Sequence, residues 1–465
     1  MDNTAKKLPM SVKWLFASGD FAKTLLVVMT AAFSLFFYTD VLGMDSKIVA
    51  TIILIAKIWD FINDPMMGAL VDRTKSKEGK CRMWLKYMSV PGGVILALNF
   101  IMPELAATGK IIWVAVTYTL QGMASTTLMI PQNTLMSRLT ADPVERAAIN
   151  SYRGYFGMAA NLVASSFAIP FVMMAGNGDM RKGFAILGIV CGVLYAVNYL
   201  IVYWCTKGYE PEESPESAAA SPVPEVKEKV KLTEVLSNWP WLIVLLAYFC
   251  TMVAASVVSS TGVYYAQYNL GDINIYSIMS FVGIAASLAV YPILSKLVAK
   301  FGNAKLVAFG GAVAAVAYLL RFLTHDANII VMYILYFFGG FGQVLVSAVV
   351  MLVGYDSYIY MRHKTGKPAP EALLVSGFSV SYKVGMAIAT PIAGWLLGSV
   401  PYVAGAATQE QSVLNLFFYE NTLLPAAFLI SALLGLLLVK FDKQIQSFKA
   451  LDAAAAQNHN VEEDN

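Results

Sequence analysis

Twelve long apolar runs dominate this sequence and limit what it can fold into. Each run is long enough to cross a hydrocarbon core of about 30 Å as an α-helix. Transmembrane β-strands are much shorter and alternate in polarity, which these runs do not. The sequence therefore predicts an all-α membrane protein with twelve transmembrane helices. The expected spans are 12–40, 47–71, 83–103, 111–137, 152–175, 183–205, 240–268, 274–299, 304–324, 328–355, 372–399 and 413–440.

The composition supports the same class. Of the 465 residues, 58% are hydrophobic and only 14% are charged, whereas soluble domains carry about 25% charged residues. This balance excludes a water-soluble enzyme, a nucleic-acid-binding protein and a disordered scaffold, and it makes the lipid bilayer the expected surroundings. The sequence contains no nucleophile constellation, metal-ligand cluster or phosphate loop, so we expect neither an enzyme nor a cofactor.

Lysine and arginine are concentrated in alternate connections between the spans. The connection after the second span contains Arg73, Lys75, Lys77, Lys80, Arg82 and Lys86. The connections after the eighth and tenth spans are also basic, while those on the opposite side are poor in both residues. Because cytoplasmic loops carry the excess of positive charge, we expect both termini to be cytoplasmic in a multi-pass protein of the inner or plasma membrane.

A polar stretch rich in Pro, Ser, Ala and Glu, residues 209–231, divides the spans into six and six and is typical of a solvated linker. The two halves echo each other, since Gly79-Lys80 follows the second span and Gly302 with Lys305 follows the eighth. Such repeats predict the major facilitator fold with two six-helix halves. The expected division is 1–208 for the N-terminal half, 209–239 for the linker, 240–442 for the C-terminal half and 443–465 for a cytoplasmic tail.

Two aspartates lie within the second span. Asp60 and Asp64 are four residues apart and share one helical face. Like charges at this spacing need a compensating cation or a shared proton, and Na⁺ prefers oxygen ligands. Further oxygens are available from Asn63 and from the fourth-span hydroxyls Ser125, Thr126 and Thr127. The sequence thus predicts a cation site. The structural alternative is that Asp64 ends or kinks the helix and that Asp60 pairs with Lys57.

Other ionisable residues at membrane depth indicate a polar pathway. Asp20, Lys23 and Thr24 lie on the first span, Arg153 on the fifth and Lys383 on the eleventh. Carboxylate and guanidinium groups form charge-assisted hydrogen bonds that suit a polyhydroxylated solute. The alternatives are an internal pair of Asp20 with Lys23, an interfacial anchor at Arg153, and a structural ion pair of Lys383 with an acidic residue such as Asp60.

Three segments, residues 37–40, 57–68 and 72–80, resemble the glycoside–pentoside–hexuronide:cation symporter family, whose type member is the melibiose permease. Weaker matches extend the likeness from about residue 11 to 400. The resemblance implies import of a sugar by symport with a cation, through alternating access of the two halves. It also implies that Asp60 and Asp64 bind Na⁺, Li⁺ or H⁺ together with Thr126, and that Asp20 or Thr24, Arg153 and Lys383 contact the sugar.

The sequence departs from the melibiose type at the fourth span. An aspartate of that type is Met129 here, and a tryptophan is Asn133. We therefore expect a different sugar specificity, with H⁺ as well as Na⁺ as a coupling ion, and place Asn133 and Lys23 among the substrate contacts. The rival functions are transport of an amphipathic lipid-like solute on the same scaffold and a non-transporting sugar sensor in the membrane.

Overall fold

The structure, a computed structural model, describes residues 8–140, 142–210, 237–365, 371–428, 430–439 and five single positions between 441 and 448. These residues form helices and short connections, with no strand among them. The chain divides into two compact units. The first unit consists of Met1–Val223, Ser260–Phe281 and Thr390–Leu414, and the second of Pro224–Ser259, Val282–Ala389 and Asn415–Asn465.

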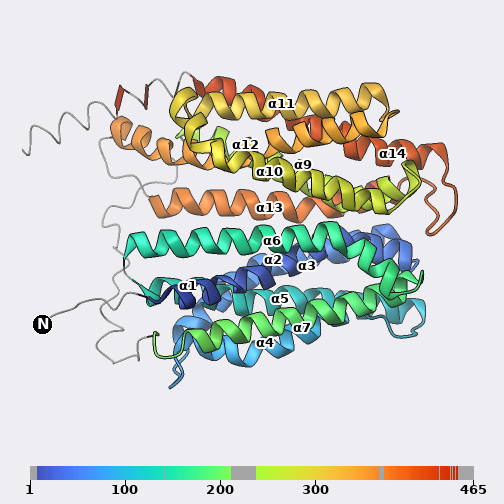
Figure 1. The fold of residues 1–465 in the computed structure, drawn as a ribbon, viewed down its shortest axis with the longest axis horizontal. Helices are drawn as coiled ribbons and strands as arrows, with labels where there is room; N and C mark the ends of the chain where they lie inside the picture. Colours follow the sequence, from blue (N-terminus) through green and yellow to red (C-terminus); the bar gives the residue numbers. More distant parts are fainter. Residues whose placement is uncertain are drawn as a thin grey trace, which may run out of the picture. The chain divides into compact units, whose positions relative to one another are not determined.

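The helices correspond to the twelve predicted spans (Figure 1). The first six spans are formed by α1 (Met10–Ala17), α2 (Gly19–Phe36) and the π-helical turn η1 (Phe37–Val41), α3 (Ser46–Arg73), α4 (Lys80–Leu98), α5 (Ala107–Leu139), α6 (Pro143–Ala175) and α7 (Met180–Cys205). The other six are formed by α9 (Trp239–Tyr264) with the π-helical turn η3 (Tyr265–Asn269), α10 (Asn274–Phe301), α11 (Asn303–Thr324), α12 (Ile329–Thr365), α13 (Glu371–Leu397) and a last span that starts with α14 (Gln411–Thr422).

The prediction of an all-helical membrane fold is confirmed. Among the described residues, eight helices are long and apolar enough to cross a membrane by length and composition. The last span is less regular than its apolar run suggests, since α14 is followed by a 3₁₀ turn, η4 (Pro425–Ala427), before helix resumes at Ile430–Val439. Pro425 is the first residue of this turn, a position that suits proline because the N–H it lacks would have no partner within the helix there.

Small residues allow equivalent spans of the two halves to pack closely. In the first unit α4 lies along α7 (Figure 1), where a Cβ on Gly93 would collide with the backbone of Gly192. In the second unit, a Cβ on Gly311 of α11 would collide with the backbone of Ala432 in the last span. The third span therefore packs closely against the sixth, and the ninth packs in the same way against the twelfth. In both pairs the contact is at a glycine that has no room for a side chain.

The internal repeat is also visible at two helix starts. Gly79 (φ 95°) precedes α4 and Gly302 (φ 80°) precedes α11, and such positive φ values favour glycine. At α4 the buried carboxylate of Glu210 accepts hydrogen bonds from the backbone N–H groups of Cys81 (3.1 Å) and Arg82 (3.2 Å). A negative charge at a helix N-terminus is stabilising, so Glu210, five residues beyond the end of α7, binds the start of α4.

An ion pair joins the first and fifth spans near their starts. Lys13 Nζ on α1 lies 2.9 Å from Glu145 Oε1 on α6, and Thr140 Oγ1 donates to the other carboxylate oxygen at 2.9 Å. The hydrogen bond from Lys13 is the main reason why the pKa of Glu145 lies below its ordinary value. This contact joins α1 to the first turn of α6, about two turns before Arg153.

Candidate substrate and cation sites

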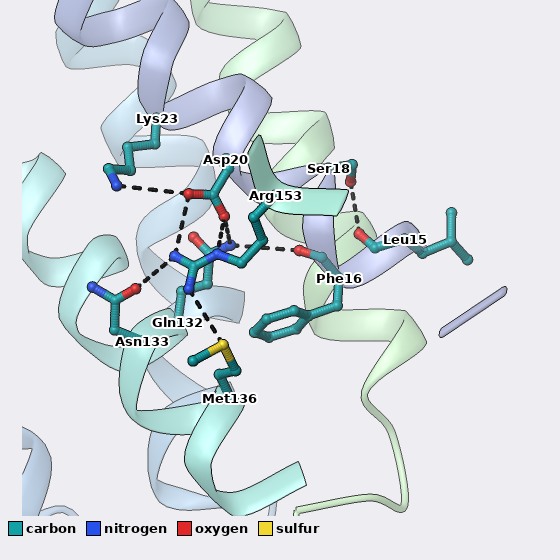
Figure 2. A network of polar contacts seen from close by, with 9 residues as sticks. All are labelled: Leu15, Phe16, Ser18, Asp20, Lys23, Gln132, Asn133, Met136 and Arg153. Atoms are coloured by element: carbon teal, nitrogen blue, oxygen red, sulfur yellow. Dashed lines mark hydrogen bonds and ion pairs between the residues drawn. The ribbon is translucent and has the colours of Figure 1, made fainter. Parts of the chain in front are cut away.

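Asp20 and Arg153 form the centre of a polar network in the first unit (Figure 2). Arg153 on α6 donates through Nε to Asp20 Oδ2 and through Nη2 to Oδ1 at 3.2 Å. The side chains are only 10% and 11% exposed for Asp20 and Arg153 respectively. A bidentate guanidinium–carboxylate pair is among the strongest charge-assisted arrangements in proteins. The network therefore joins the first and fifth spans at membrane depth.

Two consecutive residues of α5 bind the two members of this pair. The fully buried Gln132 donates through Nε2 to Asp20 Oδ2 at 3.2 Å. Asn133, which is exposed, accepts through Oδ1 from Arg153 Nη2 at 2.7 Å (Figure 2). A Cβ on Gly19 would collide with the Gln132 amide, so the glycine makes room for it beside Asp20. The fourth span thus fixes the orientation of both charged groups.

Lys23 and Thr24 are the other polar residues of α2 near this network. Lys23 Nζ lies 3.6 Å from Asp20 Oδ1, and Thr24 Oγ1 lies 3.3 Å from the place that a Cβ on Gly157 of α6 would occupy. One carboxylate therefore faces two cationic groups. Such a cluster can exchange its internal hydrogen bonds for bonds to sugar hydroxyls or to an acidic substituent.

The structure brings together four of the predicted substrate-contact residues, namely Asp20, Lys23, Asn133 and Arg153, with Thr24 on the neighbouring turn of α2. Lys383 lies on α13, which belongs to the second unit, and its side chain is exposed. Arg153 pairs with Asp20 within the unit, and the alternative of an interfacial anchor stays a prediction. The predicted Asp20–Lys23 pair is present, but the contact of Asp20 with Arg153 is closer.

The second candidate site joins α3 and α5. Thr126 Oγ1 lies 3.0 Å from Asp64 Oδ1 and 3.1 Å from the carbonyl oxygen of Gly122, one turn earlier on α5. Asp60 pairs with Lys57, whose Nζ lies 3.5 Å from Asp60 Oδ2. The two carboxylates, the hydroxyl and the carbonyl are hard oxygen donors of the kind that Na⁺ prefers. The Lys57 contact shows that the structural alternative also holds for one of the two acids.

Asn63 occupies a different face of α3 from the two aspartates. It is buried and shares that face with Ala56 and Met67, and its side-chain nitrogen makes no hydrogen bond in the described part of the chain. The structure therefore places Asp60, Asp64 and Thr126 in one region and does not direct Asn63 to it. A role for Asn63 as a cation ligand would require its side chain to turn.

Gly122 provides the room that Asp60 occupies. A Cβ built on Gly122 would overlap the Asp60 carboxylate. We expect Gly122→Ala to displace this carboxylate and to reduce coupled uptake at least tenfold, although alanine is the better helix former by about 1 kcal/mol. Uptake by the variant in right-side-out vesicles measures the effect. Gly68→Ala on α3 is the matched control, because a Cβ there meets nothing within 4 Å. Equal uptake by the two variants would contradict the prediction.

Sequence reasoning missed Gln132 and Met136, whose sulfur lies 3.4 Å from Arg153 Nη1 (Figure 2). Neither residue type marks a polar site on its own. The available signal for Gln132 was positional, since it stands between Pro131 and Asn133 in a segment that the resemblance had already singled out. Its buried amide beside a charged pair becomes informative only when the three helices are assembled.

Comparisons with known proteins agree with this architecture. The family described as MFS/sugar transport protein matches residues 15–443. A putative glycoside/cation symporter, YagG of Escherichia coli (strain K12), is 30% identical and covers 88% of this chain and 87% of its own. An isoprimeverose transporter of Lactiplantibacillus pentosus is 28% identical over 94% of this chain and 90% of its own.

Solved structures support the fold alone, because their sequences are distant. A bacterial homologue of the human lysosomal transporter Spinster, in an inward-facing conformation, superimposes with a TM-score of 0.66 at 11% identity, covering 94% of this chain and 97% of that one. The likeness extends over nearly all of both chains, as the family match does. This chain belongs to the MFS/sugar transport proteins, and within them to the glycoside–pentoside–hexuronide:cation symporters, in the major facilitator superfamily.

Proposed function

We propose that this protein imports a sugar, of the glycoside, pentoside or hexuronide class, by symport with Na⁺ or H⁺ through alternating access. The observation that carries the proposal is the pair of carboxylates on α3, with Thr126 hydrogen-bonded to Asp64. Ionisable groups at membrane depth are costly and mark ion or substrate pathways. The relatives described as a glycoside/cation symporter and an isoprimeverose transporter support the same class.

In the proposed mechanism the cation binds first to Asp60 and Asp64. Its charge offsets the repulsion between the carboxylates and favours the conformation in which the Asp20–Arg153 network accepts sugar. Coupling of this kind is reciprocal, so the sugar raises the affinity for the cation by the same factor.

In place of the carboxylate that the melibiose type has near this site, the chain has Met129, which offers no oxygen ligand.

The orientation belongs to the proposal as well. The basic connections after the second, eighth and tenth spans support a cytoplasmic location for that end of the protein and for both termini. Import then begins at the opposite end, which contains the connections after the first, seventh and eleventh spans. This is the end at which η1 and η3 lie.

The proposal is tested with purified protein in proteoliposomes. We expect an imposed Na⁺ or H⁺ gradient to drive accumulation of a radiolabelled glycoside, pentoside or glucuronide at least tenfold above protein-free vesicles. Separate Na⁺ and H⁺ gradients identify the coupling ion. Binding of a sugar without flux would contradict transport and support the function of a sugar sensor. Flux of a lysolipid without flux of a sugar would instead support transport of a lipid-like solute.

A further inference from the structure

A polar cluster that the proposed sites do not use surrounds Asp40 in η1. Its Oδ1 accepts hydrogen bonds from the hydroxyls of Tyr268 in η3 and Tyr402 in the connection after α13, and from the backbone N–H of Gly405 at 3.2 Å. These three elements belong to the same compact unit, although more than 200 residues separate Asp40 from its donors. A single carboxylate oxygen thus holds three donors from two remote segments.

The cluster is built on the internal repeat. η1 (Phe37–Val41) and η3 (Tyr265–Asn269) are both five-residue π-helical turns at the end of a span. Each is followed by a leucine and then by a glycine with positive φ, 67° for Gly43 and 76° for Gly271. Asp40 is the fourth residue of the first turn and Tyr268 the fourth of the second. Equivalent positions of the two repeats therefore bind each other.

The loop that carries Tyr402 is held in shape by its own contacts. Gln409 accepts from the backbone N–H of Val403 at 3.2 Å and donates to its carbonyl at 2.5 Å. The Tyr402 ring meets the Tyr268 ring edge-on at a centroid distance of 6.1 Å. Burial raises the pKa of Tyr402 far above its ordinary value, so its hydroxyl retains the proton that it donates. The loop presents its donors to Asp40 in a fixed arrangement.

A second layer lies directly beneath the cluster. Thr39 Oγ1 and the hydroxyl of Tyr264 are hydrogen-bonded, and the Tyr264 ring packs edge-on against Phe36 at 5.2 Å. Tyr264 and Phe36 are fully buried. The seventh span is thus joined to the first by the partly buried hydrogen bonds of Tyr268 and Gln267 to Asp40 and by the buried Thr39–Tyr264 contact.

We propose that Asp40, Tyr268 and Tyr402 form a latch that keeps this end of the transporter closed and that must open once in each transport cycle. This inference rests on the proposed function, because alternating access requires the end to open. Opening moves η3 and the 398–410 loop away from η1, and Asp40 then loses its three donors together. The latch is reversible because water replaces these hydrogen bonds on the open side.

Thiol labelling tests the latch without any substrate. Cys81, Cys191, Cys205 and Cys250 are replaced by serine, and Ala266→Cys introduces a reporter at a fully buried position of η3. The protein is placed in nanodiscs, where a polar maleimide reaches both ends. We expect Tyr402→Phe and Tyr268→Phe each to raise the labelling rate about tenfold, since a hydrogen bond to a charged group changes an equilibrium by that order.

Tyr419→Phe on α14 is the control for this comparison, because Tyr419 has an exposed side chain outside the Asp40 cluster. Equal labelling rates in all three variants would overturn the latch. Thermal unfolding of each variant shows whether a faster labelling rate reflects a general loss of structure. Such a loss would also count against the latch. The reporter is read without sugar or gradient, so failure of the latch is distinguishable from failure of the proposed symport.

A second experiment closes the latch covalently. Asp40→Cys and Tyr402→Cys are combined in the cysteine-free protein and treated with bifunctional methanethiosulfonates of several lengths. We expect cross-linking to reduce sugar flux at least tenfold, reduction to restore it, and the single-cysteine variants to be unaffected by the reagents. Undiminished flux through cross-linked protein would overturn the proposal, because the closed end would then not need to open.

Discussion

Removing either partner of the Asp20–Arg153 pair is expected to cost more stability than removing both. Asp20→Ala or Arg153→Ala leaves a poorly hydrated charge, for which the usual cost is about 3–5 kcal/mol. The double variant leaves only the charge of Lys23, whose side chain is 34% exposed and can be hydrated. The low end of that range applies, because each side chain is still about 10% exposed and a charge left behind keeps some contact with water. Thermal unfolding of the three variants in detergent gives the coupling, and additive losses would contradict it. Calorimetry should show at least tenfold weaker sugar binding in every variant.

The Lys13–Glu145 pair is a matched control for this prediction. It joins α1 to α6 at 2.9 Å, and its side chains are 15% and 10% exposed, so it is an ion pair between the same spans with burial close to that of the first pair. Lys13→Ala should lower the unfolding temperature while sugar affinity changes less than threefold. Loss of binding in Lys13→Ala comparable to that in Arg153→Ala would mean that both pairs act only through stability, and would remove Arg153 from the substrate site.

Replacing either span-2 carboxylate by its amide should uncouple transport. Asp60→Asn and Asp64→Asn retain the size of the side chain but remove the charge that binds a cation. We expect concentrative uptake to fall about a hundredfold in each variant, while exchange of labelled for unlabelled sugar across the membrane continues. Thr126→Val, which removes the hydroxyl bonded to Asp64, should have a smaller effect of about tenfold.

Asp45→Asn is the control for these substitutions. Asp45 caps the start of α3, where it accepts hydrogen bonds from the backbone of Lys47 and Ile48. Asparagine is as good an N-cap as aspartate, so loss of this charge from the same helix should leave uptake unchanged. Accumulation of sugar against a gradient by Asp60→Asn and Asp64→Asn would end the assignment of the cation site to α3.

The sequence predicts the fold well because the bilayer restricts it. Backbone groups in hydrocarbon must be satisfied within a helix, so each apolar run has one permitted structure. The last span departs from this expectation, because a 3₁₀ turn at Pro425–Ala427 interrupts its helix. The helices α6 and α12 also extend about nine and ten residues beyond their apolar runs, because a helix can continue into water with polar residues that a hydropathy pattern does not register.

The candidate site is predictable only in part. Charge at membrane depth identifies Asp20, Asp60, Asp64 and Arg153 without any structure. The pairing of Asp20 with Arg153 rather than chiefly with Lys23 depends on how α2 meets α6, which no periodicity encodes. The role of Gly122 cannot be predicted from the sequence either. A glycine in an apolar helix indicates close helix packing, and nothing in the pattern shows that the Asp60 carboxylate occupies the space beside it.

The contact between the two π-helical turns uses different residues at equivalent positions of the repeat. Two aspartates there would repel each other as carboxylates, and two tyrosines would form a hydrogen bond without a charged acceptor. Asp40 supplies the charged acceptor and Tyr268 the donor, so a charge-assisted bond between the two copies requires that they differ at this position. At this pair, a difference between two otherwise similar segments marks the place where the two repeats touch.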